Sequence, residues 1–367
     1  MKHITKLLLL PLSLGLSSLV QGNSEWDGST GDWTSAGNWS NGVPGPAPAD
    51  VNAYVNAGGV VTVQPATVVD TVGELNLRLG WTGSGVGNTV SWNPGAGENF
   101  VNQLEINNSI TASSLFNHLS GTIRVDQGWF HVARQGDATY ISSGTAELIA
   151  EDRISIGEGG GGAANGYVEM FGNAQLRTSR DATSLDVADP NGNSGNESFI
   201  AVNSTGVGTL VMNNNTIAES QNWRIANAGG SAGTVILNNN AQFRNRNNQQ
   251  ISLGRNGTGV MVANDGSQIM LMGNNGGSLR VGDDGTGTGN LTLNDSSKVI
   301  GINGTNHHVV IGDDGNTQGT VTINQNAGIA NVRNVWIGNN GSGTLIMRNN
   351  SYVDNQAGGG DAIRMAQ

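Results

Sequence analysis

A glycine-led segment recurs six times in the second half of the chain, and this repeat constrains the fold more than any other feature. The copies read GTLVMNNN, GTVILNNN, GVMVANDG, GNLTLNDS, GTVTINQN and GTLIMRNN, and their first residues are separated by 25, 26, 30, 30 and 24 positions. The copies begin at Gly208, Gly233, Gly259, Gly289, Gly319 and Gly343. Self-similarity at a period of about 20 to 50 residues indicates a solenoid, in which each repeat forms one coil.

Within each copy, apolar residues alternate with polar ones. Residues two and four places after the glycine are apolar, and this period of two predicts a strand with one buried face. The first of these columns contains Leu210, Val235, Met261, Leu291, Val321 and Leu345. Five places after the glycine, all copies but the last carry Asn: Asn213, Asn238, Asn264, Asn294 and Asn324. Because Asn favours turns and can hydrogen-bond to an Asn in the next coil, this column predicts a turn with a stacked Asn ladder.

Two further strands complete each coil. A small residue stands eight places after the glycine and a mostly bulky one ten places after it, as in Phe243 and Ile269. A third apolar pair, such as Ile251 and Leu253, precedes the next glycine. We therefore predict an all-β fold, a right-handed parallel β-helix with about three short strands per coil of 22–30 residues. It is expected to span residues 60–367, with its most regular coils over 200–367.

The first 22 residues have the layout of a secretory signal peptide: two lysines, an apolar run from Leu7 to Leu19, and small residues up to Gly22. We predict cleavage after Gly22 and a secreted protein, either extracellular or on the cell surface. No other segment approaches the roughly 18 consecutive apolar residues that a membrane-spanning helix needs, so no transmembrane segment is expected in the mature chain.

Charge and cysteine content exclude several classes of function. Loss of the two lysines of the signal takes the formal charge from −11 to −13 and leaves Lys298 as the only lysine. Nucleic acid is therefore not an expected partner, because affinity for phosphate comes from clustered Lys and Arg. The chain has no cysteine, which excludes disulfides and thiolate metal sites.

Residues 23–59 differ in composition, with three tryptophans among Gly, Ser, Asn and Pro: Trp26, Trp33 and Trp39. We predict an N-terminal cap that covers the open apolar end of the first coil. The alternative is a sugar-stacking platform built from the three rings. The W…GNWS.G.P element and the G-T-L-x-L-N style of the coils resemble secreted bacterial β-repeat proteins of the autotransporter-passenger and PEP-CTERM-associated kind. This resemblance extends over most of the chain, implies a surface or matrix protein, and brings no catalytic residues with it.

A polar insertion at 177–198 interrupts the repeat and contains four carboxylates: Asp181, Asp186, Asp189 and Glu197. We interpret it as a solvated loop, since the spacing matches no calcium motif, with a Ca²⁺ site as the alternative. At the other end of the chain, Ile363 and Met365 occupy the inward positions of another third strand. With no cap after them, we expect either a truncated chain or end-to-end self-association through the open coil.

The strongest candidates for chemistry are two Asp-Asp turns in neighbouring coils: Asp283, Asp284, Asp313 and Asp314. Stacking would bring the four carboxylates together, where they could bind Ca²⁺ or a carbohydrate, or supply an acid and a base for glycoside cleavage. The neighbouring coils carry Arg255 and Asn339 at the equivalent place, which favours a purely structural Asx turn.

The histidines and known motifs add little to these candidates. His307 and His308 lie just before the second Asp pair, whereas His118 and His131 are interpreted as ordinary polar positions. No hydrolase, zinc-protease, phosphate-loop or dinucleotide motif is present. We therefore expect a structural, adhesin-like solenoid without catalysis, whose partner is extracellular polysaccharide or a cell surface. The alternative is a carbohydrate-binding or polysaccharide-degrading β-helix that uses the stacked Asp residues.

Overall fold

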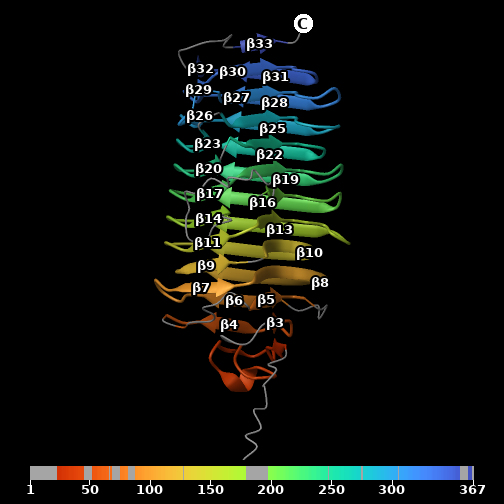
Figure 1. The fold of residues 1–367 in the computed structure, drawn as a ribbon, viewed down its shortest axis with the longest axis vertical. Helices are drawn as coiled ribbons and strands as arrows, with labels where there is room; N and C mark the ends of the chain where they lie inside the picture. Colours follow the sequence, from red (N-terminus) through yellow and green to blue (C-terminus); the bar gives the residue numbers. More distant parts are fainter. Residues whose placement is uncertain are drawn as a thin grey trace, which may run out of the picture.

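The computed structural model describes residues 23–44, 52–65, 67, 75–81, 87–126, 128–178, 197–246, 248–273, 276–304, 306–355 and 363–365. These residues form an elongated stack of coils, with β33 at the C-terminal end (Figure 1). No helix in these ranges is both long enough and apolar enough to cross a membrane.

The strands form three columns, of which the third begins at β7, and every strand pairs in parallel with its counterparts in the adjacent coils. Two long strands, β8 (Gln103–His118) and β10 (Trp129–Ser142), run from the first column into the second. The other strands of the first column are β1 (Ser24–Glu25), β3 (Asn52–Val55), β5 (Asn76–Leu79), β12 (Arg153–Ile156), β15 (Glu197–Ile200), β18 (Asn222–Ile225), β21 (Gln250–Leu253), β24 (Ser278–Val281), β27 (His308–Ile311), β30 (Asn334–Ile337) and β33 (Ile363–Met365).

The second column is composed of β2 (Thr30–Asp32), β4 (Val60–Val63), β6 (Asn88–Trp92), β13 (Ala164–Met170), β16 (Gly206–Met212), β19 (Ala232–Leu237), β22 (Thr258–Ala263), β25 (Thr288–Leu293), β28 (Gln318–Ile323) and β31 (Ser342–Met347), besides β8 and β10. The third is composed of β7 (Glu98–Val101), β9 (Thr122–Val125), β11 (Glu147–Ala150), β14 (Gln175–Thr178), β17 (Ile217–Ser220), β20 (Gln242–Asn245), β23 (Gln268–Met272), β26 (Lys298–Ile302), β29 (Gly328–Val332) and β32 (Tyr352–Asn355). The predicted parallel β-solenoid with about three strands per coil is confirmed.

The register between coils follows the sequence repeat residue for residue. Leu210 lies beside Val235, and the same partnership continues through Met261, Leu291, Val321 and Leu345. All six side chains point inward, and all but Leu345 are fully buried. The predicted strand ending the chain is also present, because Ile363 of β33 pairs with Val335 of β30.

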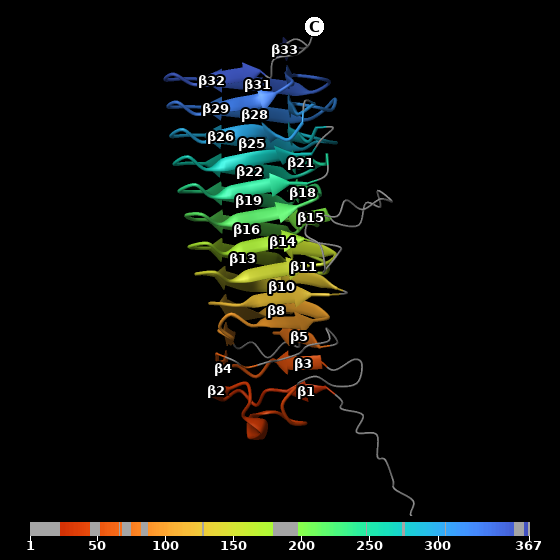
Figure 2. The ribbon, with the colours of Figure 1, turned by 60° about the vertical axis from the view of Figure 1, so that its left-hand side comes forward.

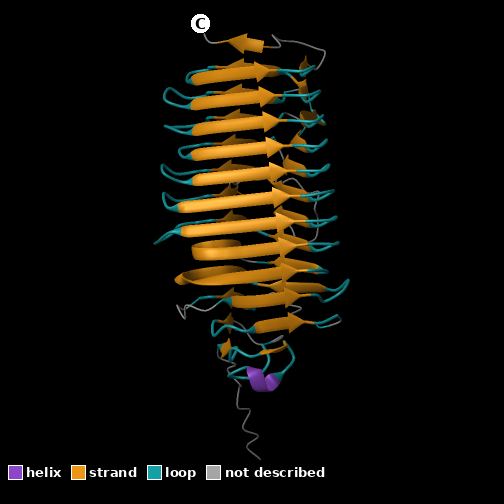
Figure 3. Ribbon diagram, turned by 180° about the vertical axis from the view of Figure 1, so that it is seen from behind, coloured by secondary structure: helices purple, strands orange, loops and turns teal. Residues whose placement is uncertain are grey.

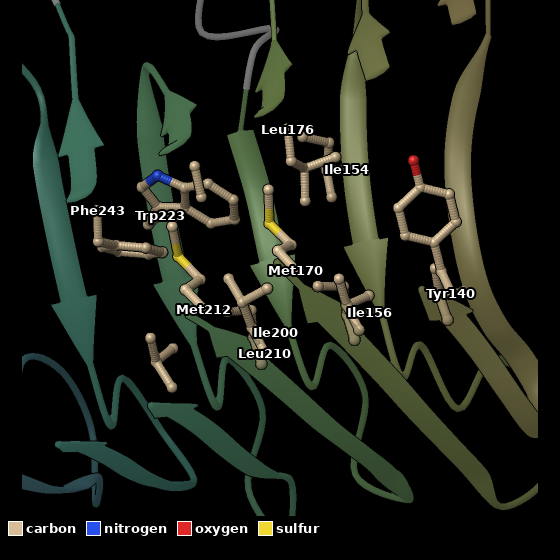
Figure 4. Close-up of a cluster of buried hydrophobic side chains, with 14 of the residues drawn as sticks. Tyr140, Ile154, Ile156, Met170, Leu176, Ile200, Leu210, Met212, Trp223 and Phe243 are labelled. Carbon is tan, nitrogen blue, oxygen red and sulfur yellow. The ribbon is translucent and has the colours of Figure 1, made fainter. Parts of the chain in front are cut away.

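Inward-facing side chains from successive coils fill the interior as a continuous core (Figure 4). Small residues in one coil are compensated by bulky residues in the adjacent coil. Ala218 occupies a third-column position where the next coil has Phe243, and the ring of Trp223 packs against Phe243 at a centroid distance of 4.6 Å. Interdigitation of this kind keeps the packing density of a solenoid close to that of other protein interiors.

The predicted Asn ladder is present at the corner between the second and third columns. The side-chain amide of Asn238 donates to Asn213 at 3.0 Å, and Asn264, Asn294 and Asn324 each donate to the preceding Asn at 2.9 Å. The left-handed backbone belongs to other residues than the ladder itself. In the coil of Asn294, for example, Asp295 and Ser296 have φ values of 49° and 66°. In this corner, therefore, one residue forms the ladder hydrogen bonds and the residues that follow it turn the chain.

The N-terminal segment lies at one end of the stack, with a 3₁₀ turn η1 (Ala36–Asn38) across that end (Figure 3). Trp39 packs edge-on against Trp26 and Trp33 at 5.0 and 4.8 Å, and Trp33 in turn contacts Trp92 in the first coils. The expected boundary at residue 60 is wrong, because β1 and β2 already pair in parallel with β3 and β4. Stacked strands thus begin inside the capping segment.

Most of the polar insertion lies outside the described residues, including Asp181, Asp186 and Asp189. Its two ends are strands instead of loop: Arg177 belongs to β14 and Glu197 to β15. Glu197 forms an ion pair with Arg224 of the next coil. Its carboxylate is therefore used in cross-coil pairing.

Candidate functional site

The two Asp-Asp turns occupy the corner between the first and second columns, directly after β24 and β27. Gly282 and Gly312 begin these turns, both with a φ of 71°. A Cβ atom on Gly282 would lie 2.6 Å from the carbonyl oxygen of Gln318, so the stacked backbone leaves room only for glycine there. This requirement fixes where each turn starts and places the following carboxylates in adjacent coils.

Arg280, in β24, joins the two inner carboxylates. Its Nη1 lies 3.3 Å from Oδ1 of Asp283 in the same coil and 2.6 Å from Oδ2 of Asp313 in the next one. The other oxygen of Asp283 accepts a hydrogen bond of 2.5 Å from Ser252, and the side-chain amide of Asn339 donates to Asp313 at 2.8 Å. Asp283 is buried, and it has an ion-pair partner as a buried carboxylate requires.

The outer carboxylates are more open to solvent. Oδ2 of Asp284 lies 3.4 Å from Nε of Arg255, and the Asp284 side chain is 46% exposed. Asp314 accepts a hydrogen bond of 2.7 Å from the backbone N–H of Gly315, the next residue in the chain. Between these residues is a polar cavity of about 310 Å³, lined by the four Asp residues together with Gln250, Arg255, Arg280 and Asn340.

The structure therefore brings the four predicted Asp residues together, but with two arginines among them. Sequence reasoning missed Arg280, because the outward position that it occupies is Ser252 in the preceding coil and Val310 in the next. Within the described ranges, no three His, Asp or Glu side chains converge as ligands of a metal ion would. The carboxylate oxygens that could bind a metal ion are engaged by arginine and serine side chains. Ca²⁺ binding stays a prediction.

His307 and His308 do not belong to this cluster. His307 is buried, where its Nδ1 accepts a hydrogen bond of 2.9 Å from the backbone N–H of Gly277, and burial lowers its pKa. The ring of His308 stacks on Trp336 with centroids 5.0 Å apart. His307 therefore contacts the segment just before β24, and His308 packs against β30 of the next coil.

The interpretation of His118 and His131 as ordinary polar positions is wrong, because both rings are buried. His118 bonds through Nδ1 to the hydroxyl of Tyr140 at 2.7 Å, and its Nε2 lies 3.0 Å from the carbonyl oxygen of Gly121. Burial lowers the pKa of His118 to about 4. The ring is therefore neutral at pH 7, so that Nε2–H donates to the carbonyl and Nδ1 accepts from Tyr140.

His131 belongs to a second charged cluster, on the outer side of the first column. Its Nδ1 lies 2.8 Å from Glu158, while Glu105 in the preceding coil pairs with Arg78 at 3.0 Å and with Arg134 at 3.6 Å. Burial raises the pKa of Glu105, although the neighbouring cations oppose this. Burial acts in the same direction on Glu158, but the hydrogen bond and charge of His131, together with the charges of Arg134 and Arg153, outweigh it and lower the pKa of Glu158. Glu105 and His131 are each 1% exposed, which makes this an ion-pair network between coils.

The tryptophans expected as a sugar-stacking alternative have no ring face open to solvent. Trp26, Trp33 and Trp39 are 0%, 1% and 4% exposed. The indole N–H groups of Trp26 and Trp39 donate to backbone carbonyls of Ser29 and Trp33, both at 2.8 Å. A sugar can stack only on an accessible ring, so the platform interpretation is corrected in favour of the cap.

Comparison with known proteins identifies no relative of this chain. A scan against protein-family models finds no match, and searches of curated proteins and of solved structures also find none. The resemblance to secreted bacterial β-repeat proteins stays a prediction, and the fold rests on the geometry of the chain itself.

Proposed function

We propose that this chain is a secreted or cell-surface β-solenoid that acts as a structural, adhesin-like scaffold without catalytic turnover. The observation that carries the proposal is the state of the inner carboxylates, since Arg280 bridges Asp283 and Asp313 across two coils. A general acid or base must reach the substrate with a free lone pair or proton. Carboxylates engaged by arginine and serine are instead suited to holding successive coils together.

Binding of a polar ligand such as a carbohydrate is the second candidate, and the cavity beside Asp284 and Asp314 favours it. The ion pairs of Arg280 are with Asp283 and Asp313, and the side chain of Asp284 is more exposed than that of its own partner, Arg255. Hydrogen bonding to sugar hydroxyls needs such accessible acceptors. This candidate includes polysaccharide degradation only if one of the two transfers a proton.

The test is a screen of the purified chain against acidic and neutral polysaccharides, scored for binding and for new reducing ends. The scaffold proposal expects retention of the chain on some polymers and no new reducing ends. The variant D284N/D314N leaves the Arg280 bridge intact and is the matched probe of the cavity. Depolymerisation that this variant loses would overturn the proposal and establish an enzyme.

Calcium binding is tested by thermal unfolding with and without millimolar calcium. A ligand that binds only the folded state raises the melting temperature. If the Asp turns form a calcium site, the increase disappears in the variant D283N/D284N/D313N/D314N. An unchanged melting temperature of the wild-type chain would leave the four residues as turn and ion-pair residues.

Export is proposed from residues 1–22, which lie outside the described residues. Mass spectrometry of the protein recovered from its host should find Asn23 at the N-terminus. Retention of residues 1–22 on the recovered protein would contradict the proposed location.

A further inference from the structure

Four consecutive coils carry the same kind of dipeptide at the corner between the first and second columns, an Asn or Asp followed by glycine. It stands two places after the glycine that begins each turn. The four dipeptides are Asn256-Gly257, Asp284-Gly285, Asp314-Gly315 and Asn340-Gly341. In such a dipeptide the backbone nitrogen of the glycine can attack the side-chain carbonyl carbon before it, because glycine has no Cβ to obstruct the approach. The product is a five-membered succinimide ring.

In the two Asn dipeptides, the nitrogen that would attack is engaged by the preceding coil. The N–H of Gly257 donates to the carbonyl oxygen of Ala226 at 3.1 Å, and the N–H of Gly341 donates to that of Gly312 at 3.2 Å. Each hydrogen bond would have to break before the nitrogen could attack, and leaving such groups unpaired is costly. The stacked backbone therefore protects both Asn residues.

The Asp314 dipeptide has the opposite arrangement. The N–H of Gly315 donates to Oδ1 of Asp314 itself at 2.7 Å. Since Cγ is one carbon–oxygen bond of about 1.2 Å beyond Oδ1, the nitrogen is held within about 4 Å of the carbon that it would attack. This is close to the separation of about 3–3.5 Å in a near-attack geometry. Asp314 and Gly315 are both exposed, so a ring can form there without displacing packed side chains.

Thr317 polarises the peptide group that carries this nitrogen. Its backbone N–H and its hydroxyl both donate to the carbonyl oxygen of Asp314, at 2.9 and 2.8 Å. That carbonyl and the N–H of Gly315 belong to one peptide group, so loss of the proton from the nitrogen places negative charge on the oxygen. Donors already aimed at a developing charge stabilise it, as in an oxyanion hole. Thr317 therefore favours the nucleophilic form of the nitrogen.

The turn of Asp284 supplies a matched comparison one coil earlier. Figure 2 shows β25 and β28, to which the two turns lead, as neighbouring strands of the stack. The carboxylate of Asp284 is paired with Arg255 at 3.4 Å. Gly285 is packed against Asn256, because a Cβ atom on this glycine would lie 1.9 Å from the side-chain oxygen of Asn256. The same dipeptide is thus held by other contacts.

From these differences we propose that Asp314 is a site of spontaneous succinimide and isoaspartate formation, and that the fold confines the reaction at this corner to Asp314. The nitrogen of Gly315 gives up its proton and bonds to Cγ of the protonated carboxyl group, and one water molecule leaves. Water then opens the ring. Attack at the main-chain carbonyl carbon leaves an isoaspartyl linkage, whereas attack at Cγ regenerates aspartate.

The modification changes the polar cavity, because Asp314 is one of its lining residues. An isoaspartyl linkage adds one methylene to the main chain and leaves a carboxylate that is one carbon shorter. The reacting residues lie at the exposed tip of the turn between β27 and β28, so the paired strands on either side keep their register. The proposal does not depend on the scaffold function proposed above.

The experiment is prolonged incubation of the folded chain at neutral pH, followed by peptide mapping with fragmentation that distinguishes isoaspartate from aspartate. The same incubation in guanidinium chloride, where both turns are lost, gives the intrinsic rate of each dipeptide. In the folded chain Asp314 should be converted at least about tenfold faster than Asp284, whereas in denaturant the two should react alike. Equal rates in the folded chain would overturn the proposal, as would protection of Asp314 relative to the denatured chain.

The matched variants are D314N and D284N, which place an identical Asn-Gly dipeptide in the two turns. Each keeps the Oδ1 atom, and deamidation raises the mass, so the reaction is read directly by mass spectrometry. Equal melting temperatures establish that both variants fold. Position 314 of D314N should deamidate at least about tenfold faster than position 284 of D284N, and faster than Asn256 and Asn340 in the same chain. Deamidation of Asn256 or Asn340 ahead of position 314 would contradict the proposed control by the fold.

Discussion

Leu291 and Asn290 are adjacent in β25, yet their side chains meet opposite environments. Leu291 is 1% exposed and lies between Met261 and Val321 of the neighbouring coils. Asn290 points outward from the same strand. Because the side-chain period of a strand is two, the fold depends strongly on one residue and little on the next.

Replacing Leu291 with Asp should therefore lower the free energy of unfolding by several kcal/mol, because an unpaired charge would enter a dry core. Asn290→Asp introduces the same carboxylate one residue away and should change it by less than about 1 kcal/mol. Urea unfolding of the two variants measures both values. Equal losses would mean that the side chain of Leu291 does not face the core.

His118 makes stability depend on pH. Its pKa is about 4 in the folded chain because the ring is buried, against about 6.5 in an unfolded one. The unfolded state therefore binds the proton first, and the stabilisation present above pH 6.5 is lost as the pH falls through 4. The difference amounts to about 3 kcal/mol.

The matched variant is His118→Gln, which keeps a donor and an acceptor but does not titrate. Wild type should lose more stability than His118→Gln between pH 7 and pH 4, when both are measured by urea unfolding. The carboxylates titrate alike in the two proteins, so the difference isolates His118. Parallel pH profiles would show that the ring is accessible to protons in the folded state.

At the scale of the element, the Asn ladder joins neighbouring coils at one corner. Asn294 donates to Asn264 and accepts from Asn324. Asn324 is the end of the ladder, because Arg348 stands at the equivalent position of the next coil. Interior and terminal members thus differ in the number of ladder hydrogen bonds that they make.

Each ladder hydrogen bond should contribute about 1 kcal/mol. Asn294→Ala should therefore cost about 2 kcal/mol, and Asn324→Ala about half of that. Chemical unfolding of the two variants gives the ratio. A ratio near one would indicate that the backbone of the turn, and not the side-chain ladder, determines the stability of this corner.

The sequence predicted these coils well wherever the repeat was regular. It missed a second ladder, in which Asn52 donates to Asn23, Asn76 to Asn52, and Asn102 to Asn76. That ladder lies in the early coils, where no G-T-L segment marks the register. Inward positions repeat because the core restricts which residues fit there. A column of Asn residues can be aligned from the sequence only where the inward positions beside it are already recognised.

At the scale of the whole molecule, outward residues distinguish one side of the stack from another. The Asp turns could be found from the sequence because they repeat, whereas Arg280 and the cluster of Glu105 and His131 could not. Outward positions vary freely from coil to coil, and a cross-coil ion pair can be inferred only after the register is known. The buried tryptophans were predicted for the same reason as the core, because an open coil end needs apolar cover.

The in-register stacking of coils is the claim on which the core and the Asp turns both depend, and the absence of cysteine allows a direct test. Met270 pairs with Ile300 in the next coil, and Ile300 with Ala330 in the coil after that. A disulfide needs Cα atoms within about 7 Å, whereas strands two coils apart are separated by about 10 Å.

The chain M270C/I300C should therefore form an intramolecular disulfide under mild oxidation, and M270C/A330C should not. Mass spectrometry of the monomer under non-reducing conditions detects the loss of two hydrogens. Efficient cross-linking of M270C/I300C alone is the predicted result. Cross-linking of M270C/A330C in preference to M270C/I300C, or of neither chain, would contradict the register and with it the stacked solenoid.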